Sequence, residues 1–395
     1  MTNDITPFRI EIPQADLDDL RNRLAGARWP ASPAADWSRG VPPAYLKELA
    51  DYWAGGFDWR AREAALNEIP QFLTEINGQR IHFFHQRSPE PGAMPLILTH
   101  GWPSSPVEFL RLIEPLTNPA KFGGDPADAF HVVIPSLPGY GFSTPLAEQG
   151  FNLFGVAQAW ATLMGRLGYQ RYVVQGTDVG AGVAGVLPFV DPAGVAGVHL
   201  TGTSASTPFG PALDVDAFTG ADRARAEKFN QFREEGIGYL HLQSTRPQTL
   251  AYGLNDSPIG QLAWIVEKFH EWTEPAEALP GSVDVDQLLT NVTLYWFTQS
   301  GASTAHAVYD GMQAWKALAA QQESSGDWEQ EGPPTGVAVF AGDTTIQGLM
   351  DPKGKIKHWS EYDRGGHFPA MEAPDLLAED LRVFTRGQGL RPTPA

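Results

Sequence analysis

The stretch YVVQGTDVGAG (172–182) places a short apolar run directly before a turn rich in small residues. Gly176 and Gly180 lie on either side of Asp178 with the spacing G-x-x-x-G. That spacing is typical of a tight turn between a strand and a helix, which exposes a nucleophilic side chain at the end of a sheet. Serine is common at the centre of such turns, but this chain has an aspartate. The stretch therefore predicts a strand, a turn and a helix, with Asp178 at the exposed corner.

Apolar runs and helical patterns alternate on both sides of this turn. Short apolar runs typical of buried strands precede helical patterns at 95–116 and 130–169, and a small-residue helix is expected at 181–190. The pattern is interrupted from about residue 208, and a strand pattern returns at 335–343. Alternating strands and helices form parallel sheets that are covered on both faces. The sequence therefore predicts an α/β fold with a mostly parallel sheet.

Four segments follow from this pattern. Residues 1–90 are expected to form an N-terminal meander, with a helix at 14–29 and a hairpin around Asn77-Gly78. The interrupted part is mostly helical and rich in aromatic residues, which is typical of a cap inserted into the core. The expected division is a meander, a first core segment, a helical cap and a second core segment, at 1–90, 91–207, 208–325 and 326–395.

Composition excludes several classes of function. A net charge of −18 without a long basic run argues against nucleic acid and against an anionic membrane surface as partners. The chain has no cysteine, which excludes disulfides and thiolate metal sites, and its histidines lack metal-ligand spacing. The sequence shows no secretory pattern and no apolar run long enough to cross a bilayer. We therefore expect a cytoplasmic protein without a metal or cofactor, for which a homodimer stays open.

Three candidate catalytic residues occur at the ends of predicted strands. They are Asp178, Asp343 after VAVFAG, and His367 within DRGGHF, in the chain order nucleophile, acid, base. This order is the one expected of α/β-hydrolases. The loop HGWPSS (100–105) follows a strand where such folds supply one oxyanion-hole N–H. We expect the backbone amides of Trp102 and Val179 to form the hole.

The aspartate points to a particular class of substrate. A carboxylate is already ionised at neutral pH, and it is a weak nucleophile toward amides but a serviceable one at a strained or activated sp³ carbon. Attack there would leave an alkyl ester on Asp178, which water activated by His367 could hydrolyse. Epoxides and alkyl halides both fit this scheme. An opening epoxide needs an O–H donor, and the cap offers Tyr239 and Tyr309.

Nearly the whole chain resembles the epoxide hydrolases of the microsomal type. The resemblance is carried by PLILTHGWP, PSLPGYGFS, GYLHLQSTRPQTLAYGLNDSPIG, LLTNVTLYWFT and RGGHFPAMEAP, with further matches in the first 90 residues. It implies an α/β-hydrolase fold with an N-terminal meander and a helical cap. It also implies that Asp178 is the nucleophile, Asp343 the acid, His367 the base and Tyr239 a cap tyrosine.

The chain departs from this family at two places. The family usually shows G-G-D-W-G at the elbow, whereas Thr177 and Val179 occur here. The family's second cap tyrosine falls most often where this chain has Val308, and Tyr309 follows one place later. One position on a helix is a rotation of about 100°. A local shift must therefore bring Tyr309 to the pocket, or His306 or a water must act in its place.

The leading hypothesis is a cofactor-independent epoxide hydrolase that forms a vicinal diol. Asp178 would open the ring, Tyr239 and Tyr309 would hold the oxygen, and His367 with Asp343 would drive hydrolysis. A haloalkane-type dehalogenase is the alternative enzyme, weakened by Val179, because a tryptophan at that position commonly helps to bind halide. A binding protein without activity is the other alternative. The many aromatic residues favour a small, apolar substrate that is bulky or aromatic, in either detoxification or secondary metabolism.

Overall fold

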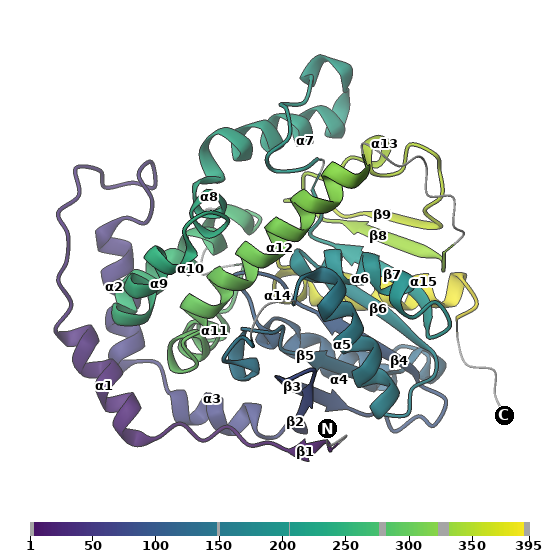
Figure 1. Cartoon of the computed structure of the whole chain (residues 1–395), viewed down its shortest axis with the longest axis horizontal. Helices are drawn as coiled ribbons and strands as arrows, with labels where there is room; N and C mark the ends of the chain where they lie inside the picture. The colour runs from purple at the N-terminus through teal and green to yellow at the C-terminus, as the bar shows by residue number, and fades with distance from the viewer. Residues whose placement is uncertain (1–3, 148–150, 205, 276–281, 323–331, 391–395) are drawn as a thin grey trace.

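The computed structural model describes residues 4–147, 151–204, 206–275, 282–322 and 332–390. Nine strands form one sheet in the order β1-β2-β3-β5-β4-β6-β7-β8-β9 (Figure 1). The pairs β1–β2, β2–β3 and β3–β5 are antiparallel, and all other pairs are parallel. The predicted mostly parallel sheet is confirmed. The strands are β1 Thr6–Pro7, β2 Gln71–Ile76, β3 Gln79–Gln86, β4 Met94–Thr99, β5 Phe130–Pro135, β6 Tyr172–Thr177, β7 Val195–Thr201, β8 Thr335–Val339 and β9 His358–Glu361.

Pairs of helices cover the sheet. Helix α5 packs beside α6, and α15 packs beside α4 (Figure 1). The central strands β4 and β6 are almost completely buried and rich in β-branched residues, as expected of strands covered on both faces. Trp160 and Phe384 are among the large fully buried side chains of the core. The covering helices are α4 Leu110–Thr117, α5 Leu153–Arg166, α6 Val179–Val190 and α15 Pro374–Gly387.

A set of helices lies between β7 and β8 in the chain and forms the cap. The long helix α12 runs across the molecule between the other cap helices and the sheet (Figure 1). Side-chain caps start two of them: the Ser257 hydroxyl accepts from Gly260 N, and the Asp284 carboxylate accepts from Gln287 N. The expected boundary between cap and second core segment, 325/326, lies outside the described residues. The cap helices are α7 Gly220–Gln231, α8 Gly238–Gln243, α9 Pro247–Asp256, α10 Pro258–Trp272, α11 Val285–Phe297 and α12 Ser300–Gln322.

The N-terminal residues form α1 (Gln14–Ala25), α2 (Pro43–Gly55) and α3 (Trp59–Leu66) and add β1 and β2 to the sheet. The expected helix at 14–29 ends at residue 25, and Gly26 is its C-cap residue, with its N–H donating to the Asn22 carbonyl. The hairpin is present: Asn77 and Gly78 both have positive φ between β2 and β3. Helices α1 and α2 pack on α10 of the cap. No helix in the described part of the chain is long and apolar enough to span a membrane.

Candidate active site

Asp178 occupies the corner between β6 and α6. Its φ of 54° lies in the left-handed region, which is uncommon for a residue with a Cβ and is typical of a strained nucleophile turn. The flanking glycines are required by close packing. A Cβ on Gly180 would lie 2.0 Å from the Thr99 carbonyl oxygen, and one on Gly176 would lie 2.0 Å from the Gly180 carbonyl oxygen. Helix α6 can therefore approach β4 and β6 closely enough to hold Asp178 at the sheet end.

The two carboxylate oxygens of Asp178 have different environments. Oδ1 accepts a hydrogen bond of 2.9 Å from the backbone N–H of Trp102. Oδ2 lies 3.6 Å from Nε2 of His367. The residue before Trp102 must be glycine, because a Cβ on Gly101 would lie 2.3 Å from the Asp178 side chain. The structure thus brings together three of the residues expected from sequence.

Val179 begins α6, so its N–H is the first in the helix and has no intrahelical acceptor. Its backbone amide follows Asp178 directly, and the positive end of the helix dipole lies there as well. The Val179 side chain is partly buried against the core, so the substitution for the family's tryptophan leaves the backbone donor in place. Among the described residues, the Trp102 amide is hydrogen-bonded to Oδ1, whereas the Val179 amide stays a predicted second donor.

His367 lies in the loop after β9, and this loop is hydrogen-bonded to cap helix α10. Its backbone N–H donates to the Trp272 carbonyl at 2.8 Å, and its ring centroid lies 4.9 Å from that of Trp272. Burial lowers the pKa of His367, and the charge of Asp178 opposes this shift. A lowered pKa keeps the imidazole neutral near pH 7, as a general base requires.

Asp343 lies in the loop after β8, next to the loop of His367. The two loops are joined by a hydrogen bond of 2.9 Å from Gly342 N to the Gly365 carbonyl. The Asp343 carboxylate accepts from Phe340 N at 3.0 Å, and no hydrogen bond joins it to His367 among the described residues. Burial raises the pKa of Asp343 to about 7, against the lowering effect of the Phe340 N–H. The acid and the base are thus brought to neighbouring loops without direct contact.

Tyr239 lies on α8 in an aromatic wall above the sheet end. Its ring stacks on Trp102 at 4.8 Å with an interplanar angle of 6°, and it meets Trp272 edge-on at 5.4 Å. The buried Lys268 ammonium lies 5.1 Å from the centroid of the same ring. Burial raises the pKa of Tyr239 well above its ordinary value, and the charge of Asp178 adds to this effect. Tyr239 therefore carries its proton and can donate it.

Tyr309 lies on α12, and its placement differs from that of Tyr239. It is partly buried, and it makes no hydrogen bond or ring contact with the described residues. His306, the other donor considered on this helix, pairs through Nε2 with Gln248 Oε1 at 3.1 Å on an exposed part of the cap. The structure therefore joins neither residue to Asp178.

Tyr140, in the loop after β5, is a residue that the sequence reasoning missed. Its ring is buried, 5.2 Å from that of His100 and 6.4 Å from that of Tyr295. Its hydroxyl forms no hydrogen bond with the described residues. Burial raises the pKa of Tyr140 above its ordinary value, and the charge of Asp178 adds to this effect. Its position at the carboxyl end of a parallel strand was the signal that could have identified it.

Glu108, in the helical pattern of residues 106–116, is another residue that the sequence reasoning missed. The segment divides into a 3-10 turn, Pro106–Phe109, and α4, so that Glu108 faces the interior. Its side chain is 1% exposed, and both carboxyl oxygens lack a hydrogen-bond partner in the described structure. Burial raises the pKa of Glu108 to about 8, against the lowering effect of the Ser104 side chain, and the charges of Asp178 and Glu372 add smaller contributions. Glu108 is therefore mostly protonated at neutral pH.

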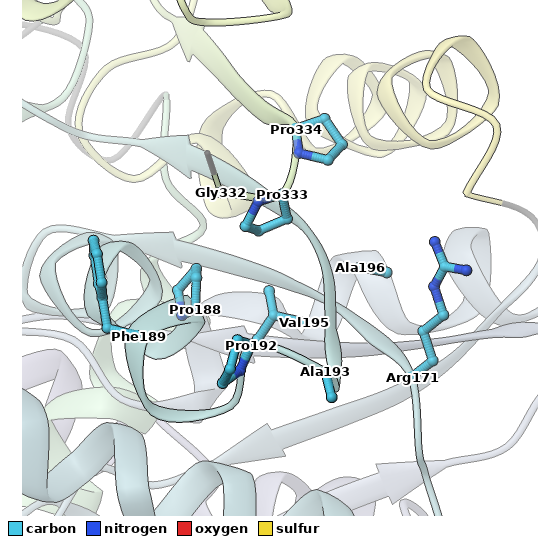
Figure 2. A pocket seen from close by; sticks show the side chains of 10 residues that line it. All are labelled: Arg171, Pro188, Phe189, Pro192, Ala193, Val195, Ala196, Gly332, Pro333 and Pro334. Carbon is cyan, nitrogen blue, oxygen red and sulfur yellow. The ribbon is translucent and has the colours of Figure 1, made fainter. Parts of the chain in front are cut away.

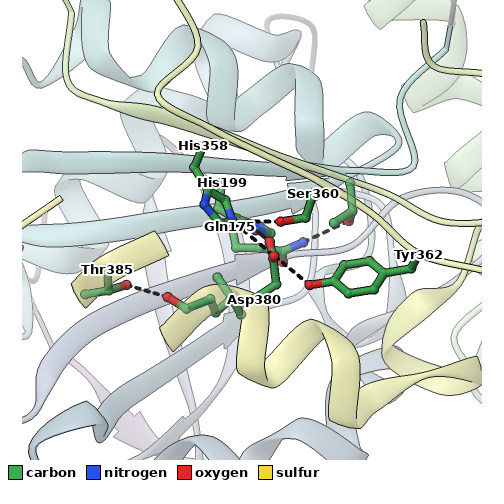
Figure 3. A network of polar contacts seen from close by, with 9 residues as sticks. Gln175, His199, His358, Ser360, Tyr362, Asp380 and Thr385 are labelled. Carbon is green, nitrogen blue, oxygen red and sulfur yellow. Dashed lines mark hydrogen bonds and ion pairs between the residues drawn. The ribbon is translucent and has the colours of Figure 1, made fainter. Parts of the chain in front are cut away.

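Other polar clusters and cavities lie apart from these residues. His199 and His358 both contact Asp380, at 2.7 and 3.0 Å, beneath the sheet (Figure 3). No group of three or more His, Cys, Asp or Glu side chains able to hold a metal occurs among the described residues. A cavity of about 410 Å³ lies at the amino ends of β7 and β8, the edge opposite to Asp178 (Figure 2). A second cavity of about 440 Å³ is lined by Asp343, Arg225 and Lys228.

Comparisons with known proteins find relatives over nearly the whole chain. Residues 5–109 match the family described as "Epoxide hydrolase N terminus", and residues 94–235 match the family described as "alpha/beta hydrolase fold". A protein of Stigmatella aurantiaca, named "Putative epoxide hydrolase", is 44% identical over 97% of this chain and 85% of its own. Epoxide hydrolase 1 of Sus scrofa is 33% identical over 96% of this chain and 88% of its own.

Two solved structures are similar to this chain over nearly its whole length. The juvenile hormone epoxide hydrolase of the silkworm Bombyx mori superposes with a TM-score of 0.85 at 30% identity, over 98% of this chain and 95% of its own. The Aspergillus niger epoxide hydrolase superposes with a TM-score of 0.81 at 30% identity, over 97% of this chain and 96% of its own. The α/β-hydrolase fold expected from the sequence is confirmed.

Proposed function

This chain belongs to the epoxide hydrolases, and we propose that it opens its substrate through a covalent ester on Asp178. One observation carries the proposal. Oδ1 of Asp178 is held by the Trp102 N–H at 2.9 Å, while Oδ2 faces His367 Nε2 at 3.6 Å. One oxygen is thus restrained by a donor and the other is available to attack. The dehalogenase and the binding protein are not favoured by the comparisons.

In the first step, Oδ2 of Asp178 attacks a carbon of the oxirane ring. The C–O bond of the ring breaks, its electron pair goes to the ring oxygen, and that oxygen takes the proton of the Tyr239 hydroxyl. The product is a hydroxyalkyl ester on Asp178 and a tyrosinate. The raised pKa of Tyr239 does not prevent this proton transfer, because the opening ring releases an alkoxide, which is a far stronger base than a phenolate.

In the second step, His367 removes a proton from water, and the hydroxide attacks Cγ of the Asp178 ester. Negative charge develops on Oδ1, where the amides of Trp102 and Val179 stabilise it. The intermediate collapses by breaking the bond between Cγ and Oδ2, and the leaving oxygen takes the proton of the hydroxide that attacked, so that the diol leaves with Oδ2. Asp178 keeps an oxygen from water, and the proton held by His367 restores Tyr239.

Asp343 is proposed to orient His367 during this second step. The bonded loops at Gly342 and Gly365 support the assignment, because they keep the two side chains in neighbouring positions. Catalytic hydrogen bonds are often long or absent before substrate binds and tighten in the reacting complex. An ionised Asp343 paired with the imidazolium would be stabilised by that charge.

Tyr309 is proposed as the second hydroxyl that holds the ring oxygen, and Tyr140 is its competitor. The observation that favours Tyr140 is its buried ring beside that of His100, together with the effect of the charge of Asp178 on the pKa of its hydroxyl. Tyr309→Phe and Tyr140→Phe separate the two. The variant that slows formation of the ester identifies the donor, and unchanged rates in both would leave Tyr239 as the only one.

The substrate proposed is an apolar epoxide that carries an aromatic or bulky group. The wall formed by Trp102, Tyr239 and Trp272 supports this class, because aromatic rings stack favourably on such a wall. A cytoplasmic location and a homodimer are also proposed from the sequence alone. Sedimentation velocity tests the dimer.

His367→Gln tests the covalent step. The variant should alkylate Asp178 and then stop, so that intact-protein mass rises by the mass of one epoxide, and digestion should locate the label on the peptide with Asp178. Asp178→Asn is the control and should stay unlabelled. If styrene oxide and bulkier aryl epoxides label neither protein, although the wild type hydrolyses them, the covalent mechanism is wrong.

A further inference from the structure

Cap helix α11 carries three hydrogen-bond donors along one face. Gln287, Asn291 and Tyr295 are four residues apart, so they lie above one another on the helix surface. All three are buried, with exposures of 8%, 1% and 1%. Each donates to a backbone carbonyl of the segment 103–107: Asn291 Nδ2 to Pro103 at 2.8 Å, Tyr295 Oη to Ser104 at 2.7 Å, and Gln287 Nε2 to Val107 at 2.8 Å.

The bonded segment continues directly from Trp102. The Trp102 N–H is the oxyanion-hole donor, and the carbonyls that Asn291 and Tyr295 bind belong to the two residues that follow it. The segment lies between β4 and α4 and has no strand partner; it consists of a turn closed by a bond of 3.1 Å from Ser104 N to the Gly101 carbonyl, followed by the 3-10 turn Pro106–Phe109. Beyond these two turns, its orientation depends on the side-chain donors from the cap.

We propose that Gln287, Asn291 and Tyr295 are positioning residues that clamp the oxyanion loop onto the cap. The inference rests on the proposed covalent mechanism, in which Oδ1 of Asp178 gains charge during ester hydrolysis. A hole donor contributes most in the step where charge develops on the atom it faces. During ring opening, by contrast, charge leaves the Asp178 carboxylate. Loosening the clamp therefore slows hydrolysis of the ester much more than its formation.

The opposite face of α11 provides a matched control. Thr293 is fully buried, and its hydroxyl accepts a hydrogen bond of 2.8 Å from the indole N–H of Trp53. It lies two positions from Asn291, which is about 200° around the helix. Thr293→Val removes a buried hydrogen bond from the same helix without touching the oxyanion loop. The Thr293→Val variant therefore shows how much a general loss of cap stability changes the rates of ester formation and ester hydrolysis.

The experiment compares Tyr295→Phe and Asn291→Leu with Thr293→Val and the wild type. Rapid-quench mass spectrometry with styrene oxide gives the rates of ester formation and of ester hydrolysis separately. Tyr295→Phe and Asn291→Leu should hydrolyse the ester about 10- to 100-fold more slowly, so that the ester accumulates, while its formation changes less than about threefold. Thr293→Val should keep the wild-type ratio of the two rates.

Hydrogen exchange provides a readout that does not depend on the chemistry. Amides of 101–107 should exchange faster in Tyr295→Phe than in the wild type, and at the wild-type rate in Thr293→Val. Equal slowing of both steps, or unchanged exchange in this segment, overturns the clamp. If the wild type hydrolyses styrene oxide without an ester, the covalent mechanism fails first, and the clamp fails with it as a device for ester hydrolysis.

Discussion

Glu108 makes the stability of this protein depend on pH in an unusual direction. Its pKa rises from an ordinary 4.5 to about 8 in the fold, because the carboxyl group is buried and the lowering effect of the Ser104 side chain is smaller than the effect of burial. Between these values the native state holds a proton that the unfolded chain has lost, so stability falls as pH rises. Each pH unit well between these values is worth about 1.4 kcal/mol, and the slope is smaller near each pKa, so the loss between pH 4.5 and 8 is about 4 kcal/mol.

Glu108→Gln removes this dependence, because the amide keeps the size of the side chain and cannot ionise. The free energy of unfolding, measured in urea from pH 5 to 9, should fall less steeply for the variant, with a difference between the two curves of about 4 kcal/mol across that range. The pKa values of Asp343 and Glu372 are also raised, but both groups are present in the wild type and in the variant. Their contributions therefore cancel in the difference between the two curves. Glu114→Gln, whose side chain is 58% exposed, is the control and should follow the wild type. Parallel curves for Glu108→Gln and the wild type would refute a protonated buried Glu108.

Three other outcomes follow from the site and its support. Tyr239→Phe should slow ester formation about 10²- to 10⁴-fold in single-turnover measurements but leave hydrolysis of a formed ester almost unchanged. Gly180→Ala should cost about 3 kcal/mol or more in thermal unfolding, since its Cβ would overlap the Thr99 carbonyl. Asp380→Asn should destabilise the protein by about 3–5 kcal/mol at pH 7. The pKa of Asp380 is lowered in the fold, so this difference should shrink as pH falls below its unfolded value of about 3.9.

Features that depend on one strand and the turn after it were predictable from the sequence. The elbow at Asp178 and the loop at Trp102 each follow an apolar run, His367 follows a predicted strand, and parallel strands bring their carboxyl ends to one edge. The hairpin at Asn77-Gly78 was predictable for the same local reason. These elements need no knowledge of distant contacts.

Features that depend on distant contacts were not predictable. Gln287, Asn291 and Tyr295 form a regular series in the sequence, but nothing in it names backbone carbonyls almost 190 residues away as their partners. Glu108 lies in a helical pattern, but in the fold it belongs to a 3-10 turn before α4 and is buried. The distance between Asp343 and His367 is likewise set by how two loops pack.

The N-terminal segment is tied to the cap at several places. Trp37 stacks on His270 of α10 at 3.6 Å, Trp53 bonds Thr293 of α11, and Arg23 bonds the Asp256 carbonyl of α9 at 3.0 Å. The same segment is joined to the sheet through β1 and β2. It therefore bridges the two parts that enclose the active site.

This bridge has a consequence for recombining such enzymes. If the cap alone were exchanged between two relatives, it would pack against the N-terminal segment of the other protein. The Trp53 indole and the Arg23 guanidinium of that segment would then lose their acceptors in the cap. The cap and the first 70 residues therefore form one unit of exchange, although more than 100 residues of chain separate them. Chimeras that move both together should keep their fold and carry their substrate preference with them.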